Sequence, residues 1–275
     1  MKVNRVVRIV LVSSICAMAN VSSAALIGYY GLNETGSLKG NTAADSSGSG
    51  QNGKYAAAGT GPVSIASANA GLYGTAVHFD STAGHTDYAD MTPFNGLTQT
   101  GAFTYAAWIN PDSTQLATPT IIGNLNSNLR GYDFRIVSAG SGNWNLRLTN
   151  PSGAPTTFTT IATIPSGTWT HVAVTKDVDG SGGVGLSNIQ FYVNGIAVDS
   201  GTIGLTGATN QAQLYIAAGR SGSQYFGGGV DEVRIYNEVL TGSAIADLAV
   251  VPEPATLLLV ASMLCCVGGL RRNGR

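Results

Sequence analysis

The sequence predicts an all-β protein in which two antiparallel sheets pack face to face as a sandwich. Short runs of alternating apolar residues recur through the middle of the chain, and breaks containing glycine or proline separate them. No long amphipathic helical pattern intervenes between these runs, which favours a sandwich over a βαβ fold. The 37 glycines fit long surface loops, because the apolar alternation persists between them.

Asn194-Gly195 is the strongest hairpin signal in the chain. Both residues tolerate the positive φ that a two-residue type I′ turn requires. In the resulting register Val193 faces Ile196 and Phe191 faces Val198, with all four side chains on one side of the ribbon. The pair of strands is therefore predicted to cover a β core with one apolar face.

The other strands are predicted from the same alternation. In the run from Phe103 to Asn110, every second residue from Phe103 onward is apolar and shares one face. The stretch from Thr35 to Gly61 is rich in Gly, Ser, Asn and Ala, and it contains a predicted loop of turn formers from Asp45 to Gly53. One short helix is predicted, with Thr241 as its N-cap and with Ile245 and Leu248 on one face. Further strands are predicted at residues 26–32, 76–80, 120–122, 132–137, 144–148, 158–164, 169–176, 189–198, 213–218 and 228–237.

Three segments resemble the laminin-G-like jelly roll of the concanavalin A-like lectin and glucanase superfamily. They are Trp169-Thr170-His171-Val172-Ala173, Phe191-Tyr192-Val193-Asn194-Gly195 and Val230-Asp231-Glu232-Val233-Arg234-Ile235-Tyr236-Asn237. The resemblance extends more weakly from Leu26 to Leu248, which places one domain at residues 25–250. It implies the sandwich but no single activity, because this fold carries lectins, adhesins and glycosidases alike.

The N-terminus has the layout of a secretory signal peptide, assigned to residues 1–24. Basic residues precede an apolar run from Ile9 to Ala19, and Ser22-Ser23-Ala24 offers the small residues of a cleavage site. A permanent anchor is the alternative, but the apolar run is short for a membrane span.

The C-terminus, residues 251–275, resembles a PEP-CTERM sorting tail. Pro252, Glu253 and Pro254 precede an apolar stretch at about 256–270 and a basic end at 271–275. The resemblance implies an exported Gram-negative envelope protein that an exosortase processes near the motif. Fifteen residues at 1.5 Å each span roughly 22 Å, which is short against a hydrocarbon core of roughly 30 Å. The stretch therefore predicts transient inner-membrane anchorage by a C-terminal helix, with a permanent anchor as the alternative.

Charge and cysteine usage limit the partners of the predicted domain. Residues 25–250 hold 8 basic and 14 acidic residues, a formal net charge of −6. Such a domain is a poor candidate for nucleic acid, and it suits neutral ligands or divalent cations. All three cysteines lie in the two ends, so the domain has no disulfide and its stability must come from its core.

A first candidate calcium site is the loop that begins at Asp177. Asp177, Asp179 and Ser181 alternate as oxygen ligands do in the first half of an EF-hand loop, and Val184 falls at the hydrophobic eighth position. The twelfth position is Asn188 instead of the bidentate glutamate. A solvated hairpin loop is the alternative interpretation.

A second candidate calcium site pairs Asp231 with the loop around Asp45. The resemblance suggests it, because related sandwiches often join an N-terminal loop to a carboxylate on the last strand through a structural calcium ion. The alternative is that Asp231 caps a turn or accepts hydrogen bonds from backbone amides.

Glycosidase chemistry is not predicted. Retaining hydrolysis needs two carboxyl groups about 5 Å apart, which alternate positions on one strand face can supply. No Glu-x-Asp-x-x-Glu run occurs in the chain. Asp231 and Glu232 are adjacent and are therefore expected to point to opposite faces.

Sugar binding requires an aromatic platform with polar neighbours. Trp108 and Trp169 are expected in the core. The weak candidates for ligand contact are Tyr132, Trp144, Tyr215, Tyr225 and Phe226.

The sequence as a whole predicts a non-catalytic extracellular binding module for carbohydrate or exopolysaccharide, with calcium as a possible cofactor. The alternatives are a structural surface or matrix protein without a small ligand and, third, a glycosidase.

Overall fold

The computed structural model describes residues 25–34, 38–57, 64–66, 75–81, 86–98, 100–116, 119–125, 128, 130–205, 213–219 and 224–250. The predicted signal peptide and sorting tail lie outside these residues. Within the described ranges, no helix is long and apolar enough to cross a membrane.

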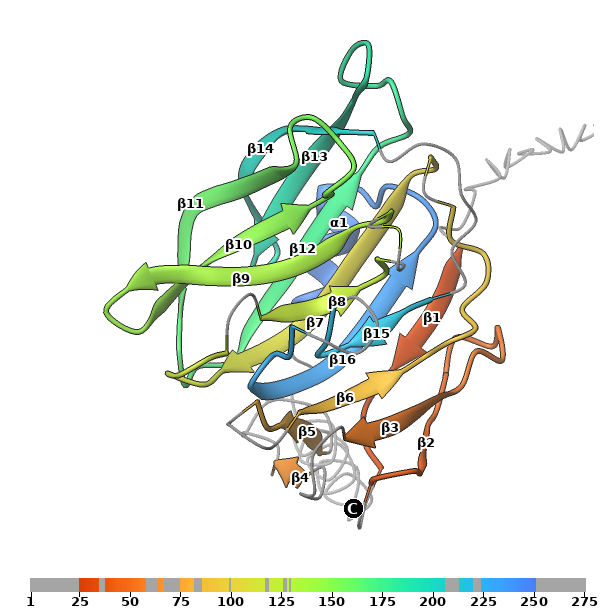
Figure 1. Cartoon of the computed structure of the whole chain (residues 1–275), viewed down its shortest axis with the longest axis vertical. Coiled ribbons are helices and arrows are strands. Elements are labelled where there is room, and N and C mark those ends of the chain that lie inside the picture. Colours follow the sequence, from red (N-terminus) through yellow and green to blue (C-terminus); the bar gives the residue numbers. More distant parts are fainter. Residues whose placement is uncertain are drawn as a thin grey trace, which may run out of the picture.

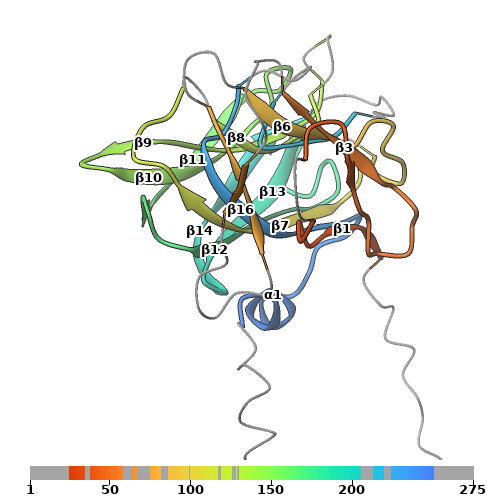
Figure 2. The same cartoon turned by 90° about the horizontal axis from the view of Figure 1, so that it is seen from below.

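Two antiparallel sheets of eight strands each form a sandwich, as predicted (Figures 1 and 2). The strands of sheet A are β1 (Leu26–Tyr30), β4 (Ser64–Ala66), β5 (Ala76–Phe79), β7 (Phe103–Pro111), β12 (Thr170–Lys176), β13 (Leu186–Val193), β14 (Ile196–Gly204) and β16 (Gly228–Tyr236). The strands of sheet B are β2 (Thr42–Ala43), β3 (Gly53–Ala57), β6 (Asp87–Asp90), β8 (Thr120–Gly123), β9 (Asp133–Gly140), β10 (Asn143–Thr149), β11 (Thr157–Pro165) and β15 (Tyr215–Ile216).

The strand order places distant parts of the chain side by side. Sheet A runs β14-β13-β12-β7-β16-β5-β4, and β1 also pairs with β16. Sheet B runs β11-β10-β9-β8-β15-β6-β3-β2. The turn formers that begin at Asp45 form the predicted loop, which connects β2 to β3, but neither of these two strands was predicted. The small residues around Tyr55 hide a strand whose one large ring is buried in the core.

The Asn194-Gly195 turn is confirmed, with φ values of 48° and 78°. Val193 pairs with Ile196 as predicted, but Phe191 pairs with Asp199 and not with Val198. A β-bulge between Phe191 and Tyr192 shifts the register by one residue. Alternation along the sequence fixes the turn but cannot reveal an extra residue in the ladder.

The main core fills the space between the sheets. Phe103, Tyr105, Ala107 and Ile109 of β7 all belong to it, which confirms the alternation predicted for this strand. Trp108 points the other way, and its ring lies against His171 with the centroids 5.6 Å apart. The expectation that Trp169 belongs to the core was wrong. Trp169 is half-buried and lies outside both hydrophobic clusters of the described residues.

Helix α1 (Gly242–Leu248) covers the outer face of sheet A, the face turned away from sheet B (Figure 2). Its N-cap is Thr241 as predicted, and the Thr241 hydroxyl accepts a hydrogen bond of 3.2 Å from the Ala244 amide. Ile245 is fully buried in a second cluster that includes Ala106 and Ala173 of sheet A. Complete burial of such a side chain contributes about 1.5–3 kcal/mol.

The hairpin turn also supports this helix, which gives a first prediction. Gly195 has φ +78°, and a Cβ there would approach the Ala246 Cα of α1 to 2.8 Å. Gly167 has φ +69° with open space around it, so Gly167→Ala isolates the backbone cost. We expect unfolding free energies to fall by about 1 kcal/mol in Gly167→Ala and about 2 kcal/mol or more in Gly195→Ala. Urea denaturation of both variants measures this difference. Equal losses would contradict a role for Gly195 in seating the helix.

Candidate functional site

Three of the five aromatic candidates lie in the core and not at the surface. Tyr132 and Phe226 are fully buried, and Trp144 is 7% exposed and packs with them. A ring enclosed between the two sheets has no free face on which a sugar can stack. Their burial therefore argues against a role for these three residues in ligand contact. The prediction failed because alternation alone did not reveal which face of each strand meets the core.

The other two candidates, Tyr215 and Tyr225, gather around Tyr88 on the outer face of sheet B. Ala89 and Ile216 point into the core, so their neighbours Tyr88 and Tyr215 point outward. The ring centroid of Tyr88 lies 6.0 Å from that of Tyr215 and 5.9 Å from that of Tyr225. We call these three residues the tyrosine cluster.

The tyrosine cluster combines ring surface with hydrogen-bonding groups. Tyr88 and Tyr225 are half-buried, and Tyr215 is 7% exposed. Burial raises the pKa of Tyr88 and of Tyr215, and the nearby Asp90 carboxylate adds to both shifts. Both hydroxyl groups therefore stay protonated at neutral pH and can donate hydrogen bonds. Sequence reasoning missed Tyr88 because β6 was not predicted as a strand.

A buried ion pair supports the Tyr225 side of the cluster. The Arg135 guanidinium lies 2.5 Å from an Asp133 carboxylate oxygen and donates a hydrogen bond of 3.2 Å to the Gln224 side chain. Burial raises the pKa of Asp133 to about 6, although Arg135 opposes this shift. Gln224 has φ +61°, a strained conformation that these contacts and a 3.0 Å bond from the Thr120 amide hold in place.

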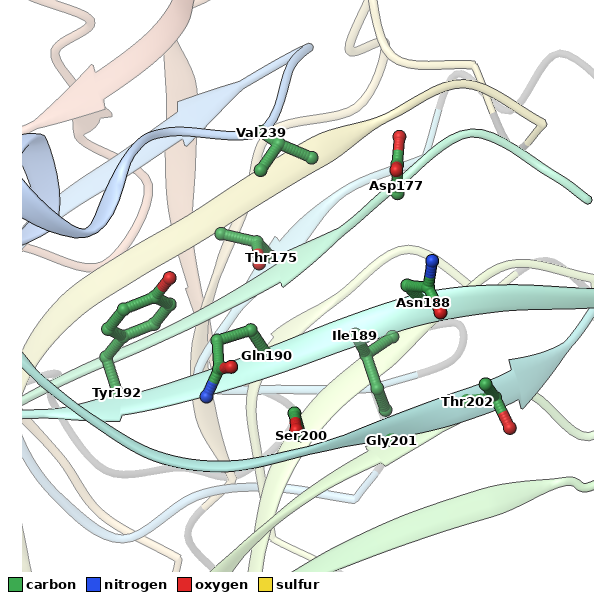
Figure 3. A pocket seen from close by; sticks show the side chains of 10 residues that line it. All are labelled: Thr175, Asp177, Asn188, Ile189, Gln190, Tyr192, Ser200, Gly201, Thr202 and Val239. Carbon is green, nitrogen blue, oxygen red and sulfur yellow. The ribbon is translucent and has the colours of Figure 1, made fainter. Parts of the chain in front are cut away.

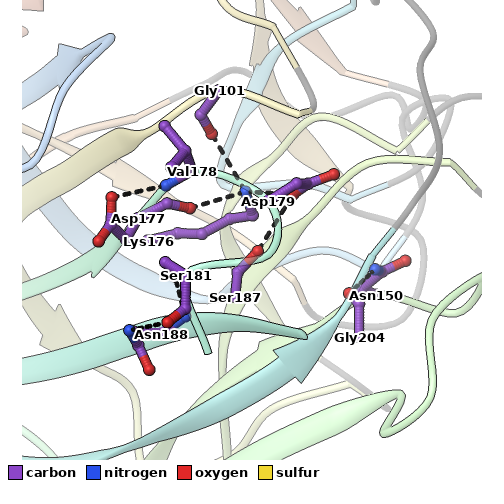
Figure 4. A network of polar contacts seen from close by, with 10 residues as sticks. All are labelled: Gly101, Asn150, Lys176, Asp177, Val178, Asp179, Ser181, Ser187, Asn188 and Gly204. Carbon is purple, nitrogen blue, oxygen red and sulfur yellow. Dashed lines mark hydrogen bonds and ion pairs between the residues drawn. The ribbon is translucent and has the colours of Figure 1, made fainter. Parts of the chain in front are cut away.

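The first candidate calcium loop surrounds a lysine (Figure 4). The Lys176 ammonium group is fully buried and donates to three oxygens: the carbonyls of Gly101 (3.1 Å) and Asp177 (3.0 Å), and the Asp179 carboxylate (2.8 Å). The faces of Phe103 and Tyr132 lie 5.8 and 5.2 Å from the same nitrogen. Burial lowers the pKa of Lys176, and the Asp179 carboxylate opposes that shift.

Two further oxygens of this loop accept hydrogen bonds from the loop itself. Asp177 accepts from the Val178 amide at 2.7 Å, and the Ser181 hydroxyl accepts from the Asn188 amide at 3.0 Å. Val184, assigned to the hydrophobic position of an EF-hand, is fully exposed. These observations agree with the hairpin-loop interpretation, in which an ammonium group and not a metal ion gathers the oxygens.

The second candidate calcium site is not assembled as a ligand set. Asp45 is bonded within its own loop and to β1, where its carboxylate accepts from the amides of Tyr29, Ser47 and Gln51 at 2.9 to 3.0 Å. These bonds and one from the Ser47 hydroxyl lower the pKa of Asp45, although burial acts in the opposite direction. Across the described ranges, no group of three or more His, Cys, Asp and Glu side chains is placed to hold a metal ion. Calcium binding therefore stays a prediction.

Asp231 and Glu232 lie at a β-bulge, so the expectation that they alternate between opposite faces was too simple. The register with β7 shifts between Asp231 and Arg234, and Glu232 has φ +52°. The Glu232 carboxylate accepts from the Tyr29 hydroxyl at 2.9 Å and pairs with Arg234. Asp231 is fully buried, and burial raises its pKa to about 8.

A polar groove of about 520 Å³ opens on the outer face of sheet A (Figure 3). Its floor is built from β12, β13 and β14, and Val239 lies along one side. The groove therefore lies on the opposite side of the sandwich from the tyrosine cluster. The sequence did not predict it, because neighbouring residues in the groove are far apart along the chain.

Comparison with known proteins identifies the family and the fold. A family model described as the concanavalin A-like lectin/glucanases superfamily matches residues 82–246. No curated protein matched the sequence.

Solved structures with the same fold include a domain of a secreted enzyme and toxin binding domains. Domain 4 of AbnA, a GH43 extracellular arabinanase from Geobacillus stearothermophilus solved with arabinotriose, has 23% identity and a TM-score of 0.58, covering 82% of this chain and 98% of that one. The binding domain of botulinum neurotoxin DC, solved with rat synaptotagmin II, has 18% identity and a TM-score of 0.54, covering 82% and 51%.

A structure of botulinum neurotoxin type C, described as depending on two ganglioside molecules for cell entry, has 18% identity and a TM-score of 0.53, covering 85% and 52%. This chain thus spans about half the length of the toxin structures. At these identities the likeness shows the fold alone.

The buried lysine gives the second prediction. Lys176→Met removes the positive charge that pairs with the Asp179 carboxylate. It also leaves the carbonyls of Gly101 and Asp177 without this donor. Loss of one partner of a buried ion pair costs about 3–5 kcal/mol. We expect a loss of this size by chemical denaturation, whereas the matched control Lys54→Met, at an exposed position, stays within about 0.5 kcal/mol of the parent.

Calcium and EDTA arms of the same experiment test the metal interpretation. If Lys176 organises the loop, EDTA leaves the stability difference between the parent protein and Lys176→Met unchanged. A Lys176→Met variant as stable as the parent, or a difference that disappears in EDTA, would contradict the ammonium-centred loop.

Proposed function

The chain belongs to the concanavalin A-like lectin/glucanases superfamily, and we propose that it is a non-catalytic extracellular module that binds carbohydrate. The observation that carries this proposal is the tyrosine cluster on the outer face of sheet B. Sugar rings stack their C–H faces on aromatic rings, while hydroxyl and carboxylate groups beside the rings fix their orientation. Tyr88, Tyr225 and the neighbouring Asp90 supply both kinds of contact on one rigid sheet.

The comparisons support the same ligand class. Domain 4 of the arabinanase was solved with arabinotriose, and the neurotoxin type C structure is described through its interaction with gangliosides. Both ligands carry sugar rings, so a glycan is the ligand class that these relatives suggest for this chain. The arabinanase is extracellular, which is compatible with export by the predicted signal peptide.

The acidic pair on β16 supports a non-catalytic role. Glu232 is tied to Tyr29 and Arg234, and Asp231 has a raised pKa of about 8 in a fully buried position. Retaining hydrolysis needs two carboxyl groups that both face the substrate. A buried acid beside a fully bonded carboxylate does not meet this requirement, so a binding role fits better than a hydrolytic one.

The third prediction tests the tyrosine cluster. Tyr88→Ala and Tyr225→Ala are expected to weaken binding at least tenfold, about 1.4 kcal/mol, because each removes a stacking ring. Tyr88→Phe and Tyr225→Phe are the matched controls, since they keep the ring and lose only the hydroxyl. A glycan array followed by titration calorimetry with arabinotriose, xylotriose, cellotriose and maltotriose measures the effect on the purified full chain.

Each outcome of this experiment decides between functions. A folded protein that binds no glycan, in calcium or in EDTA, would reject the carbohydrate module and leave the structural surface protein as the better reading. Binding that EDTA abolishes would point to calcium held near Asp45 or Asp231. Alanine variants that bind as well as the parent would remove the tyrosine cluster from the site.

We also propose exosortase sorting through the C-terminal tail, with transient anchorage in the inner membrane of a Gram-negative host. The support is the Pro-Glu-Pro motif at 252–254, the apolar stretch after it and the basic end. Helix α1 ends at Leu248, so processing near the motif would leave every described strand intact.

The fourth prediction follows from this tail. Alanine substitution of Pro252, Glu253 and Pro254 together should block tail removal without blocking export. Mass spectrometry of the protein from the cell envelope and the medium measures the tail, and Asp247→Ala, an exposed position just upstream, is the control. A mature mass identical to that of the parent would refute the sorting signal.

A further inference from the structure

The groove on the outer face of sheet A is a regular grid of short polar side chains. Strand pairing places Thr175, Gln190 and Ser200 in one row across β12, β13 and β14. Asn188 and Thr202 pair in the next row. Neighbouring strands lie about 4.8 Å apart, which is close to the length of one sugar ring. Polar groups therefore repeat across the groove at the spacing of a saccharide.

The hydrogen bonds of the sheet fix the direction of the amide groups. The Gln190 side-chain nitrogen donates to the Asp199 carbonyl at 2.7 Å, and the Asn188 side-chain nitrogen donates to the Ser181 carbonyl at 2.9 Å. The Gln190 nitrogen also donates to the Phe191 carbonyl at 3.1 Å, so each amide nitrogen is held by the protein while the amide oxygen is left for another group. Asp177 binds one amide through one oxygen and keeps the second. Within the described part of the chain, these three oxygens have no other hydrogen-bond partner.

The groove is therefore a set of preorganised acceptors with hydroxyl groups among them. A ligand that fits must supply many hydroxyl donors, as a saccharide does. None of the described residues that line the groove is basic, so a phosphate or carboxylate ligand would lack a counter-charge there. Val239, 42% exposed, supplies apolar surface for sugar C–H groups, and it lies beside the Tyr192 ring, which is 7% exposed and packs in the second cluster. The volume of about 520 Å³ lies within the usual range of roughly 300–1,000 Å³ for small-ligand sites.

We propose that this groove binds a second neutral oligosaccharide, so that one domain holds two glycan chains on opposite outer faces of its sandwich. This inference rests on the proposed function, since it assigns a second site of the same ligand class. A module with one site on each face can bridge two polysaccharide chains without forming a dimer. The gain comes from linkage of two binding events on one rigid body.

The fifth prediction separates the two sites. Titration calorimetry of the full chain with arabinotriose, xylotriose, cellotriose and maltotriose in turn should give two equivalents per chain. Ser200→Trp fills the groove from an exposed position and should leave one equivalent, as should Thr202→Arg, a second variant with a different side chain. Tyr88→Ala should also leave one equivalent, and Ser200→Trp combined with Tyr88→Ala should leave none. Thr163→Trp, on exposed β11, controls for added bulk.

A bridging measurement completes the test. The parent protein should raise the turbidity of linear arabinan, xylan or whichever parent polymer binds, and each single-site variant should lose this effect. Light scattering must find a monomer, because a dimer could also bridge. One equivalent in the parent, unchanged by Ser200→Trp and lost in Tyr88→Ala, overturns the second site while the proposed function stands. No binding to any probe overturns both.

Discussion

Strand β16 is the constraint on which the rest of the sandwich depends. It pairs with β7, β5 and β1, so it joins the first strand of the domain to strands from its middle. One strand cannot satisfy all these partners with a uniform ladder. The bulge between Asp231 and Arg234 absorbs the mismatch, and Glu232 adopts a left-handed conformation to form it. Near the start of β16, Gly229 lets the Trp169 ring lie where a Cβ would clash with it, at 2.7 Å.

Two buried basic side chains hold loops in shape where other proteins often use metal ions. Lys176 gathers two carbonyls and a carboxylate, and Arg135 joins Asp133 to Gln224. A covalently attached cation costs no binding entropy and does not depend on the supply of a metal ion. It also explains how a domain without cysteines can keep long loops ordered, since buried charge pairs restrict the loops where disulfides otherwise would.

The hairpin turn and the helix cap could be predicted from a few adjacent residues. The strand register and the direction of the side chains depend on pairing between distant segments of the chain. Asn194-Gly195 and the Thr241 cap were predicted correctly because their physics involves only a few adjacent residues. The bulge at Phe191 and the inward direction of Tyr132 depend on which strands lie beside them, and period-2 alternation does not contain that information. For the same reason two residues of the tyrosine cluster were named from sequence, while Tyr88, which joins them, emerged only from the pairing of β6 with β15.

The net charge of the domain restricts the class of expected ligands more than the chemistry of either outer face of the sandwich does alone. The domain carries a formal net charge of −6, so an acidic polysaccharide is repelled before contact, most strongly at low salt. Arg135 is paired with Asp133, and Lys176 is enclosed by its loop, so neither of these two cations offsets that repulsion. Lys54 is exposed on the same outer face as the tyrosine cluster, but its strand partner is the acidic Asp90. Neutral glycans are not repelled in this way. They can stack on tyrosine rings and donate hydrogen bonds to fixed amide oxygens, and neither interaction needs a charge on the ligand. The charge of the domain and the chemistry of its two outer faces thus both favour the neutral glycan that we propose as its ligand.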